Sequence, residues 1–183
     1  PLFRCGQGSG ASPIIWILTM DSIISAVSNT GTPGTLITNP SGTIISDRIF
    51  DVFVDDACIS CINSPTPDTY RQPTQSIQTN MSRLAQHFAN ELHSTGGKLN
   101  LDKCQLVSVN FTNTSQLTYS ITDHNLTVSD PATDTITTIP QLSPHTSYRT
   151  LGFHIAADGS HENQLRILRE RVSSWSSIIT HSR

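Results

Sequence analysis

The sequence predicts an α+β fold in which antiparallel strands form a sheet backed by two helices. Two segments, residues 13–28 and 74–94, carry apolar residues at helical spacing. Short segments between and after them read as strands, because they are bounded by turn residues. The predicted order is helix, hairpin, hairpin, helix, strand, excursion, strand, helix. Such an order is typical of α+β layers.

Length and composition limit the class of protein. The chain has 183 residues, enough for one domain with a core. Its net charge is -3, so its overall charge does not indicate nucleic-acid binding. It has no apolar run of about 18 residues and no visible signal peptide, so we expect no membrane partner and an intracellular protein, cytoplasmic or nuclear. Because the chain begins at Pro1 rather than Met, we expect a fragment of a longer protein.

The first helix is predicted to begin at Ser12-Pro13, where Ser caps free N–H groups and Pro occupies the first helical position. The loop before it is rich in glycine, and a glycine-rich loop at a helix N-terminus suits an anion such as phosphate. An ordinary loop before a core helix is the alternative. Apolar residues crowd the first turns, which predicts a buried start, and the expected buried stripe is Ile17, Met20, Ile24 and Val27.

Two hairpins are predicted next. Strands at 35–38 and 43–46 flank an Asn-Pro-Ser-Gly turn, and strands at 48–54 and 57–62 flank the Asp55-Asp56 pair. Adjacent carboxylates repel each other unless a cation lies between them, and their hard oxygens favour Mg²⁺. A solvated turn is the alternative. Strand periodicity also puts Asp51 on the face of Asp55, either near the metal or at a strand margin.

The second helix is expected to bury Ile77, Met81, Leu84, Phe88 and Leu92, to carry a surface pair of His87 and Glu91, and to end at Gly96-Gly97. A strand from 98 to 111 should follow. Residues 112–147, rich in Ser and Thr, predict an irregular and mobile hairpin excursion. A strand over 148–156 containing Gly152 comes next, and then a helix over 161–181. The expected apolar stripe of that last helix is Leu165, Leu168, Val172, Trp175, Ile178 and Ile179, beside Arg166, Arg169 and Arg171.

Cys58 and Cys61 have the spacing of a zinc or redox motif. In a strand, however, residues three apart point to opposite faces, and no second Cys pair completes a site. We therefore interpret these two thiols, with Cys5 and Cys104, as reduced structural residues of an intracellular protein.

Four motifs occur in a recognisable order: Gln7-Gly8-Ser9-Gly10-Ala11-Ser12-Pro13, Phe53-Val54-Asp55-Asp56, Gly96-Gly97-Lys98-Leu99-Asn100 through Lys103-Cys104, and Leu151-Gly152-Phe153. The chain resembles the palm of reverse transcriptases of the retrotransposon type, closely over residues 4–111 and loosely over 148–180. The four motifs look like that family's B, C, D and E motifs. Phe53 stands where the family more often has Tyr or Ala, and the upstream A motif, which supplies another metal-binding Asp, is not in this chain.

The resemblance implies RNA-directed DNA polymerase activity by two-metal nucleotidyl transfer, with Mg²⁺ as the cofactor and Mn²⁺ as a substitute. Asp55 and Asp56 would bind the metals, and Lys103, in preference to Lys98, would neutralise the leaving pyrophosphate. The implied nucleotide and template contacts are Gln7, Gly8, Ser9, Ser12 and Pro13, and the implied primer grip is Leu151, Gly152 and Phe153.

The implied partners are an RNA or DNA template, a DNA primer, deoxynucleotides and the rest of a parent polyprotein with the fingers and upstream palm. The resemblance implies a partial palm over 1–156, including the excursion at 112–147, and the start of a thumb or connecting helix over 157–183. We expect the fragment alone to be inactive. One alternative is a non-catalytic relic acting as a nucleic-acid-binding or structural module. Another is an unrelated Ser/Thr-rich interaction domain that binds a cation at Asp55 and Asp56.

Overall fold

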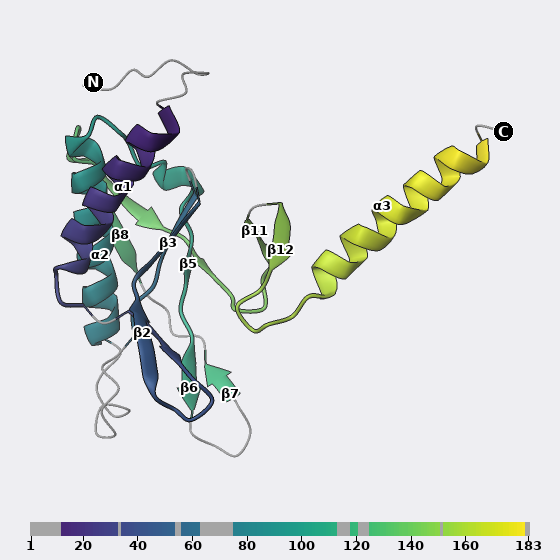
Figure 1. Cartoon of the computed structure of the whole chain (residues 1–183), viewed down its shortest axis with the longest axis horizontal. Coiled ribbons are helices and arrows are strands. Elements are labelled where there is room, and N and C mark those ends of the chain that lie inside the picture. The colour runs from purple at the N-terminus through teal and green to yellow at the C-terminus, as the bar shows by residue number, and fades with distance from the viewer. Residues whose placement is uncertain are drawn as a thin grey trace. The chain divides into compact units, whose positions relative to one another are not determined.

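The chain is α+β, as the sequence predicts, in a computed structural model that describes residues 12–32, 34–53, 56–62, 75–112, 118–120, 125–150 and 152–181. Within these ranges there are three α-helices, one short 3-10 helix and six two-stranded β pairs, five antiparallel and one parallel (Figure 1). The chain divides into two compact units, Pro1–Gln105 with His124–Pro140, and Leu106–Asp123 with Gln141–Arg183.

The first unit contains two long helices and three hairpins. Its elements are α1 (Ser12–Ser28), β1 (Thr35–Thr38), β2 (Ile44–Arg48), β3 (Phe50–Phe53), β4 (Asp56–Ile59), α2 (Gln75–Ser94), η2 (Leu101–Lys103), β8 (Leu126–Ser129) and β9 (Ile136–Ile139). The pairs β1–β2, β3–β4 and β8–β9 are all antiparallel. Both helices and the first hairpin lie within one residue or two of the predicted ranges.

The core of the first unit lies where α1 and α2 meet the β3–β4 hairpin (Figure 1). The rings of Phe50 in β3 and Phe88 in α2 are tilted against each other, with centroids 5.5 Å apart. An aromatic pair of this kind contributes about 0.5–1.5 kcal/mol of stability beyond that gained from the area it buries. The buried residues of this core are Met20, Ile23, Val27, Ile49, Leu84 and Phe88.

The apolar start of α1 is exposed, which corrects the prediction that it is buried. Ile17 is 64% exposed, and the buried stripe is Met20, Ile23 and Val27, with Ile23 in place of the predicted Ile24. The first turns are apolar on every side, so a neighbour on one side covers only part of them. The contact with α2 selects the stripe with regular three- and four-residue spacing.

Part of the Ser/Thr-rich excursion belongs to the folded core rather than to a mobile loop. Strand β8 packs against α2 and buries Leu126 and Val128. The side chain of Gln86 in α2 accepts a hydrogen bond from the backbone N–H of Ser129, at 2.8 Å, and donates one to its carbonyl, at 3.0 Å. This bidentate link gives the edge of β8 a partner in place of another strand.

Two predicted strands are interrupted. The segment 98–111 contains a 3-10 turn, because the N–H of Lys103 bonds to the Asn100 carbonyl, at 3.0 Å, and that of Cys104 to Leu101, at 3.1 Å. The alternation of Leu99 and Leu101 is typical of a strand, but the hydrogen bonds of Lys103 and Cys104 turn the chain there. The segment 148–156 is a hairpin rather than one strand. Gly152 has φ +84°, a conformation that glycine adopts without strain and that reverses the chain.

The second unit has shorter strands and the last helix. Its elements are β5 (Leu106–Val107), β6 (Asn110–Thr112), β7 (Thr118–Ser120), β10 (Gln141–Leu142), β11 (Tyr148–Thr150), β12 (Phe153–Ile155) and α3 (Glu162–His181). Strands β6–β7 and β11–β12 pair antiparallel, β10–β5 pair parallel, and α3 contacts β12. Among the described helices, none is long and apolar enough to cross a membrane.

Candidate functional site

The β3–β4 hairpin has one apolar face and one acidic face. Its register pairs Phe53 with Asp56 and Asp51 with Cys58. Residues that are directly opposite in an antiparallel pair project to the same face, and alternate residues along a strand do so as well. Asp51, Asp56 and Cys58 therefore share one face of the hairpin, and all three are exposed.

The opposite face of the hairpin fixes its position. Phe50, Val52 and Ile59 alternate with the acidic-face residues and pack against the core formed with α1 and α2. A neighbouring backbone contact extends this attachment, since the N–H of Ser60 bonds to the Ile49 carbonyl at 2.8 Å. The acidic face is thus held at the surface by the packing on the other side of the same strands.

Asp56 opens β4 rather than lying in a turn, which corrects the predicted strand start at Ala57. It is exposed, and in the described part of the chain no ion pair engages its carboxylate. Val54 and Asp55 follow β3 in sequence and lie outside the described residues. Asp55, the predicted main metal ligand, is therefore the sequence neighbour of Asp56, whose carboxylate is accessible to solvent.

The sequence leaves two positions possible for Asp51, near a metal ion or at a strand margin. It lies within β3, not at a strand margin, and forms an exposed ion pair with Arg48. Although Cys58 lies on the exposed face, protein atoms around its sulfur partly desolvate the thiolate, and this, followed by the nearby negative charge of Asp51, raises the pKa of the thiol. Burial also raises the pKa of Cys61 to about 11, which keeps that thiol protonated and agrees with a structural role.

These oxygen donors fit a hard divalent cation better than a soft one. Asp51 and Asp56 lie two residues apart along the strand direction, or about 7 Å. That spacing allows two carboxylates to approach neighbouring ions from one face. Among the described residues, which do not include Asp55, no three His, Cys, Asp or Glu side chains lie close enough together to hold one metal ion.

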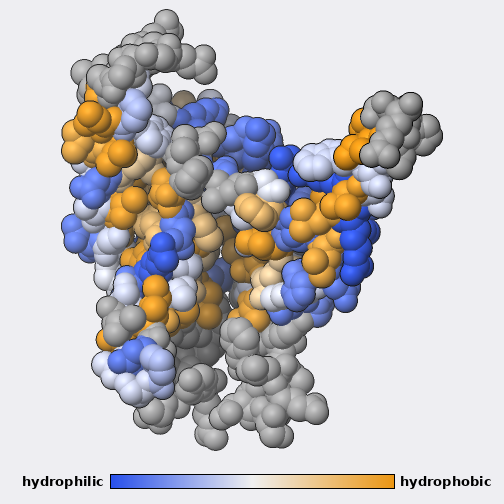
Figure 2. Space-filling model, turned by 45° about the vertical axis from the view of Figure 1, so that its right-hand side comes forward, coloured by the Kyte–Doolittle hydropathy of each residue, from blue (hydrophilic) through white to orange (hydrophobic). Residues whose placement is uncertain are grey.

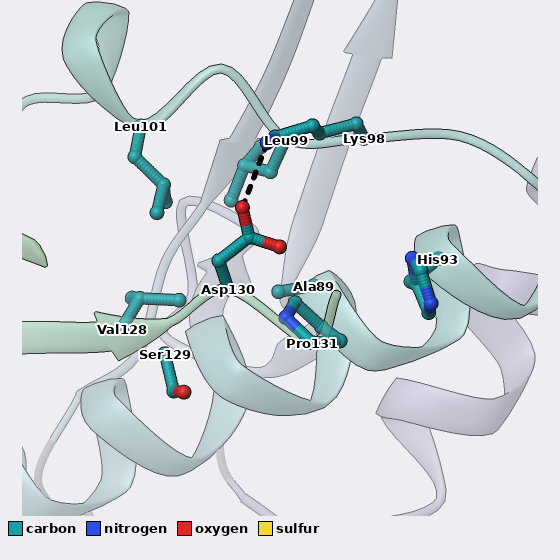
Figure 3. Close-up of a pocket in the computed structure, with 9 residues that line it drawn as sticks. All are labelled: Ala89, His93, Lys98, Leu99, Leu101, Val128, Ser129, Asp130 and Pro131. Carbon is teal, nitrogen blue, oxygen red and sulfur yellow. Dashed lines mark ion pairs between the residues drawn. The ribbon is translucent and has the colours of Figure 1, made fainter. Parts of the chain in front are cut away.

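The Lys98 side chain has a structural contact. Its ammonium lies 2.7 Å from Oδ2 of Asp130, at the turn between β8 and β9 (Figure 3). The hydrogen bond from Lys98, followed by that from the Ala132 N–H, holds the pKa of Asp130 below its usual value. The small pocket beside this pair has apolar lining from α2, the segment after it, η2, β8 and the turn after β8, and His93 stands at its margin (Figure 3). Its apolar lining residues are Ala89, Leu99, Leu101, Val128 and Pro131.

Lys103, the preferred lysine of the sequence prediction, is exposed in η2. In the described residues no hydrogen bond or ion pair joins it to Asp56. Ser12 and Pro13 form the first turn of α1, with Pro13 exposed, whereas Gln7, Gly8 and Ser9 lie outside the described residues.

The predicted primer grip falls in the second unit. Gly152 and Phe153 are exposed, Phe153 by 61%, and Leu151 lies outside the described residues. Thr150 pairs with Phe153 at the end of the β11–β12 hairpin. An exposed aromatic ring beside a glycine turn is a suitable surface for a sugar or a base.

Comparisons of the chain with protein-family models, with curated proteins and with solved structures found no match.

Proposed function

We propose that this chain is the palm segment of a retroelement reverse transcriptase, an RNA-directed DNA polymerase that uses two Mg²⁺ ions. The order of the four sequence motifs suggests the class of protein. The observation that carries the proposal is the two-faced β3–β4 hairpin, which presents Asp56 to solvent while its other face packs on α1 and α2. A single antiparallel palm sheet and a thumb beginning at α3 are part of the same proposal.

In this mechanism Asp55 and Asp56 hold the metal ions, together with a carboxylate from an upstream segment. Mn²⁺ replaces Mg²⁺ at the same oxygen ligands. Metal ions held there would supply positive charge for the attacking 3′-hydroxyl oxygen and the leaving pyrophosphate oxygen of an in-line displacement. Lys103, exposed in η2, would supply positive charge to the leaving pyrophosphate.

The substrate contacts follow the same division. Gln7, Gly8 and Ser9, with the first turn of α1 at Ser12 and Pro13, contact the incoming nucleotide and template. Leu151, Gly152 and Phe153 contact the DNA primer. The net charge of -3 is compatible with this role if the fingers and the rest of the thumb in the parent polyprotein supply most phosphate contacts.

Metal binding by this chain is the first test. Mn²⁺ is titrated into the protein and the free ion is followed by its electron paramagnetic resonance signal. We expect Asp55→Asn and Asp56→Asn each to weaken binding about tenfold or more, since each removes one anionic ligand. Asp102→Asn, which removes an exposed carboxylate in η2, is the matched control and should leave binding unchanged. Equal binding by all four proteins would contradict the metal site.

Polymerase activity is the second test, and it requires the parent protein with its upstream carboxylate. We expect Mg²⁺-dependent extension of a DNA primer on an RNA template, and its loss in Asp55→Asn. Extension that is unchanged by Asp55→Asn would overturn the proposal. Primer–template binding without extension in the unaltered parent would instead identify a non-catalytic relic.

A further inference from the structure

Helix α3 carries an apolar face that its own unit does not cover. Its first turn is anchored to β12, where the Gln164 side chain accepts a hydrogen bond from the His154 N–H at 2.8 Å. From Leu168 to Ile179 every residue is exposed. Figure 2 shows apolar side chains along this helix beside a polar strip. Exposed apolar faces of this extent mark sites of association.

The spacing of the exposed apolar residues is that of a coiled coil. Five of the six, from Leu165 to Ile179, recur alternately three and four residues apart, which keeps them in one narrow seam on the helix, and the sixth, Ile178, lies beside that seam. The a positions of this heptad pattern are Leu165, Val172 and Ile179, and the d positions are Leu168 and Trp175. On the outer side Arg166 pairs with Glu170 at 2.7 Å, as expected of a face that remains in water.

We infer that this seam binds the same seam of a second copy of the chain, in a parallel and in-register pair of helices. Two of the three a residues, Val172 and Ile179, are β-branched, and one of the two d residues is Leu168. This distribution favours two-stranded parallel coiled coils over higher oligomers. The inference does not depend on the proposed polymerase function.

The flanking charges agree with the parallel arrangement. In a parallel pair each g residue faces the e residue of the following heptad. Here that brings Gln164 to Arg169 and Arg171 to Ser176, and no like charges meet. In the antiparallel pairing that sets Leu168 against Val172, each of the two arginines would face its own counterpart and repel it. The antiparallel pairing that sets Val172 against Trp175 has no such repulsion, so a cysteine cross-link decides between it and the parallel pair.

Sedimentation equilibrium of the full chain over a range of concentrations tests the association. We expect a reversible dimer, and we expect Val172→Glu to weaken it about tenfold or more, because two carboxylates would then face each other in a dry seam. Ser173→Glu introduces the same charge on the outer side of the same helix and should leave the dimer intact. If Val172→Glu does not fold, as judged by circular dichroism, Leu168→Gln replaces it.

A cysteine cross-link tests the orientation. In a chain whose native cysteines are replaced by Ala, Leu165→Cys should form an intermolecular disulfide, since only an in-register parallel pair brings the two positions together. Ser173→Cys should not. A monomer at all concentrations, a dimer that Val172→Glu leaves unchanged, or a dimer in which Leu165→Cys fails to cross-link would overturn the inference.

Discussion

Leu84 is one of the fully buried residues of the core that supports the acidic hairpin face. It is 0% exposed and lies in α2, within the core that joins α1 to the β3–β4 hairpin. Leu84→Ala removes three buried carbons, which costs about 2.4 kcal/mol of transfer free energy at about 0.8 kcal/mol each. The space left behind adds a cavity term, so we expect a total loss of about 3–5 kcal/mol in the free energy of unfolding.

The two tryptophans allow this loss to be measured in the first unit alone. Trp16 lies in α1 and Trp175 in α3, and the chain has no other Trp. In a Trp175→Phe background, fluorescence during urea unfolding reports on the unit that contains α1. Linear extrapolation then gives the free energy of unfolding with and without Leu84→Ala.

The matched control is Leu18→Ala in α1. Leu18 is 62% exposed, so the same chemical change should alter the free energy of unfolding by only about 0.5 kcal/mol. A loss below about 1 kcal/mol for Leu84→Ala, or an equal loss for the two variants, would refute the packing of α2 described above. The same Leu84→Ala protein should also bind Mn²⁺ less well near its unfolding transition, since the hairpin then loses its support.

Two further changes test the contacts around the site. Gly34→Ala should destabilise the first unit by about 1–3 kcal/mol, because an added Cβ would lie 2.5 Å from the carbonyl carbon and oxygen of Arg48. Urea unfolding should show this loss, and an unchanged free energy of unfolding would contradict the close approach of the two backbones. Asp130→Asn should lower stability at neutral pH by removing the partner of Lys98. Because the folded pKa of Asp130 lies below its unfolded value of about 3.9, its contribution is complete above that pH and is lost as pH falls through the folded pKa. Unfolding curves of the two proteins should therefore converge in acid, and a constant difference from pH 7 to pH 2 would refute the ion pair as the cause.

The helices were predictable because their signal is local. Regular spacing identified α2 and α3 to within a residue or so, and Gly96, with φ +84°, ends α2 as expected. The apolar start of α1 shows the limit of this reasoning. The hydrophobicity of a segment gives the free energy that burial would contribute, but it does not show whether another element packs against that segment.

The site was predictable only where it depends on neighbours in sequence. The Asp pair indicated a hairpin, and the β3–β4 pair agrees with that expectation. The place of Asp51 could not be settled, because it depends on the register with β4. The partner of Lys98 could not be predicted either, since Asp130 comes from a hairpin far along the chain and reaches Lys98 only through the packing of β8 on α2.

The register of the β3–β4 pair determines which side chains face the core and which acidic side chains face solvent. Strand side chains alternate with period two, so a slip of β4 by one residue against the core would turn Asp56 inward and Ile59 outward. Burial of an unpaired carboxylate and exposure of an apolar side chain would both oppose that slip. The packing of Phe50, Val52 and Ile59 therefore does more than stabilise the hairpin. It selects a register in which Asp56, the described member of the proposed metal-binding pair, lies on the solvent face, as the proposed metal site requires.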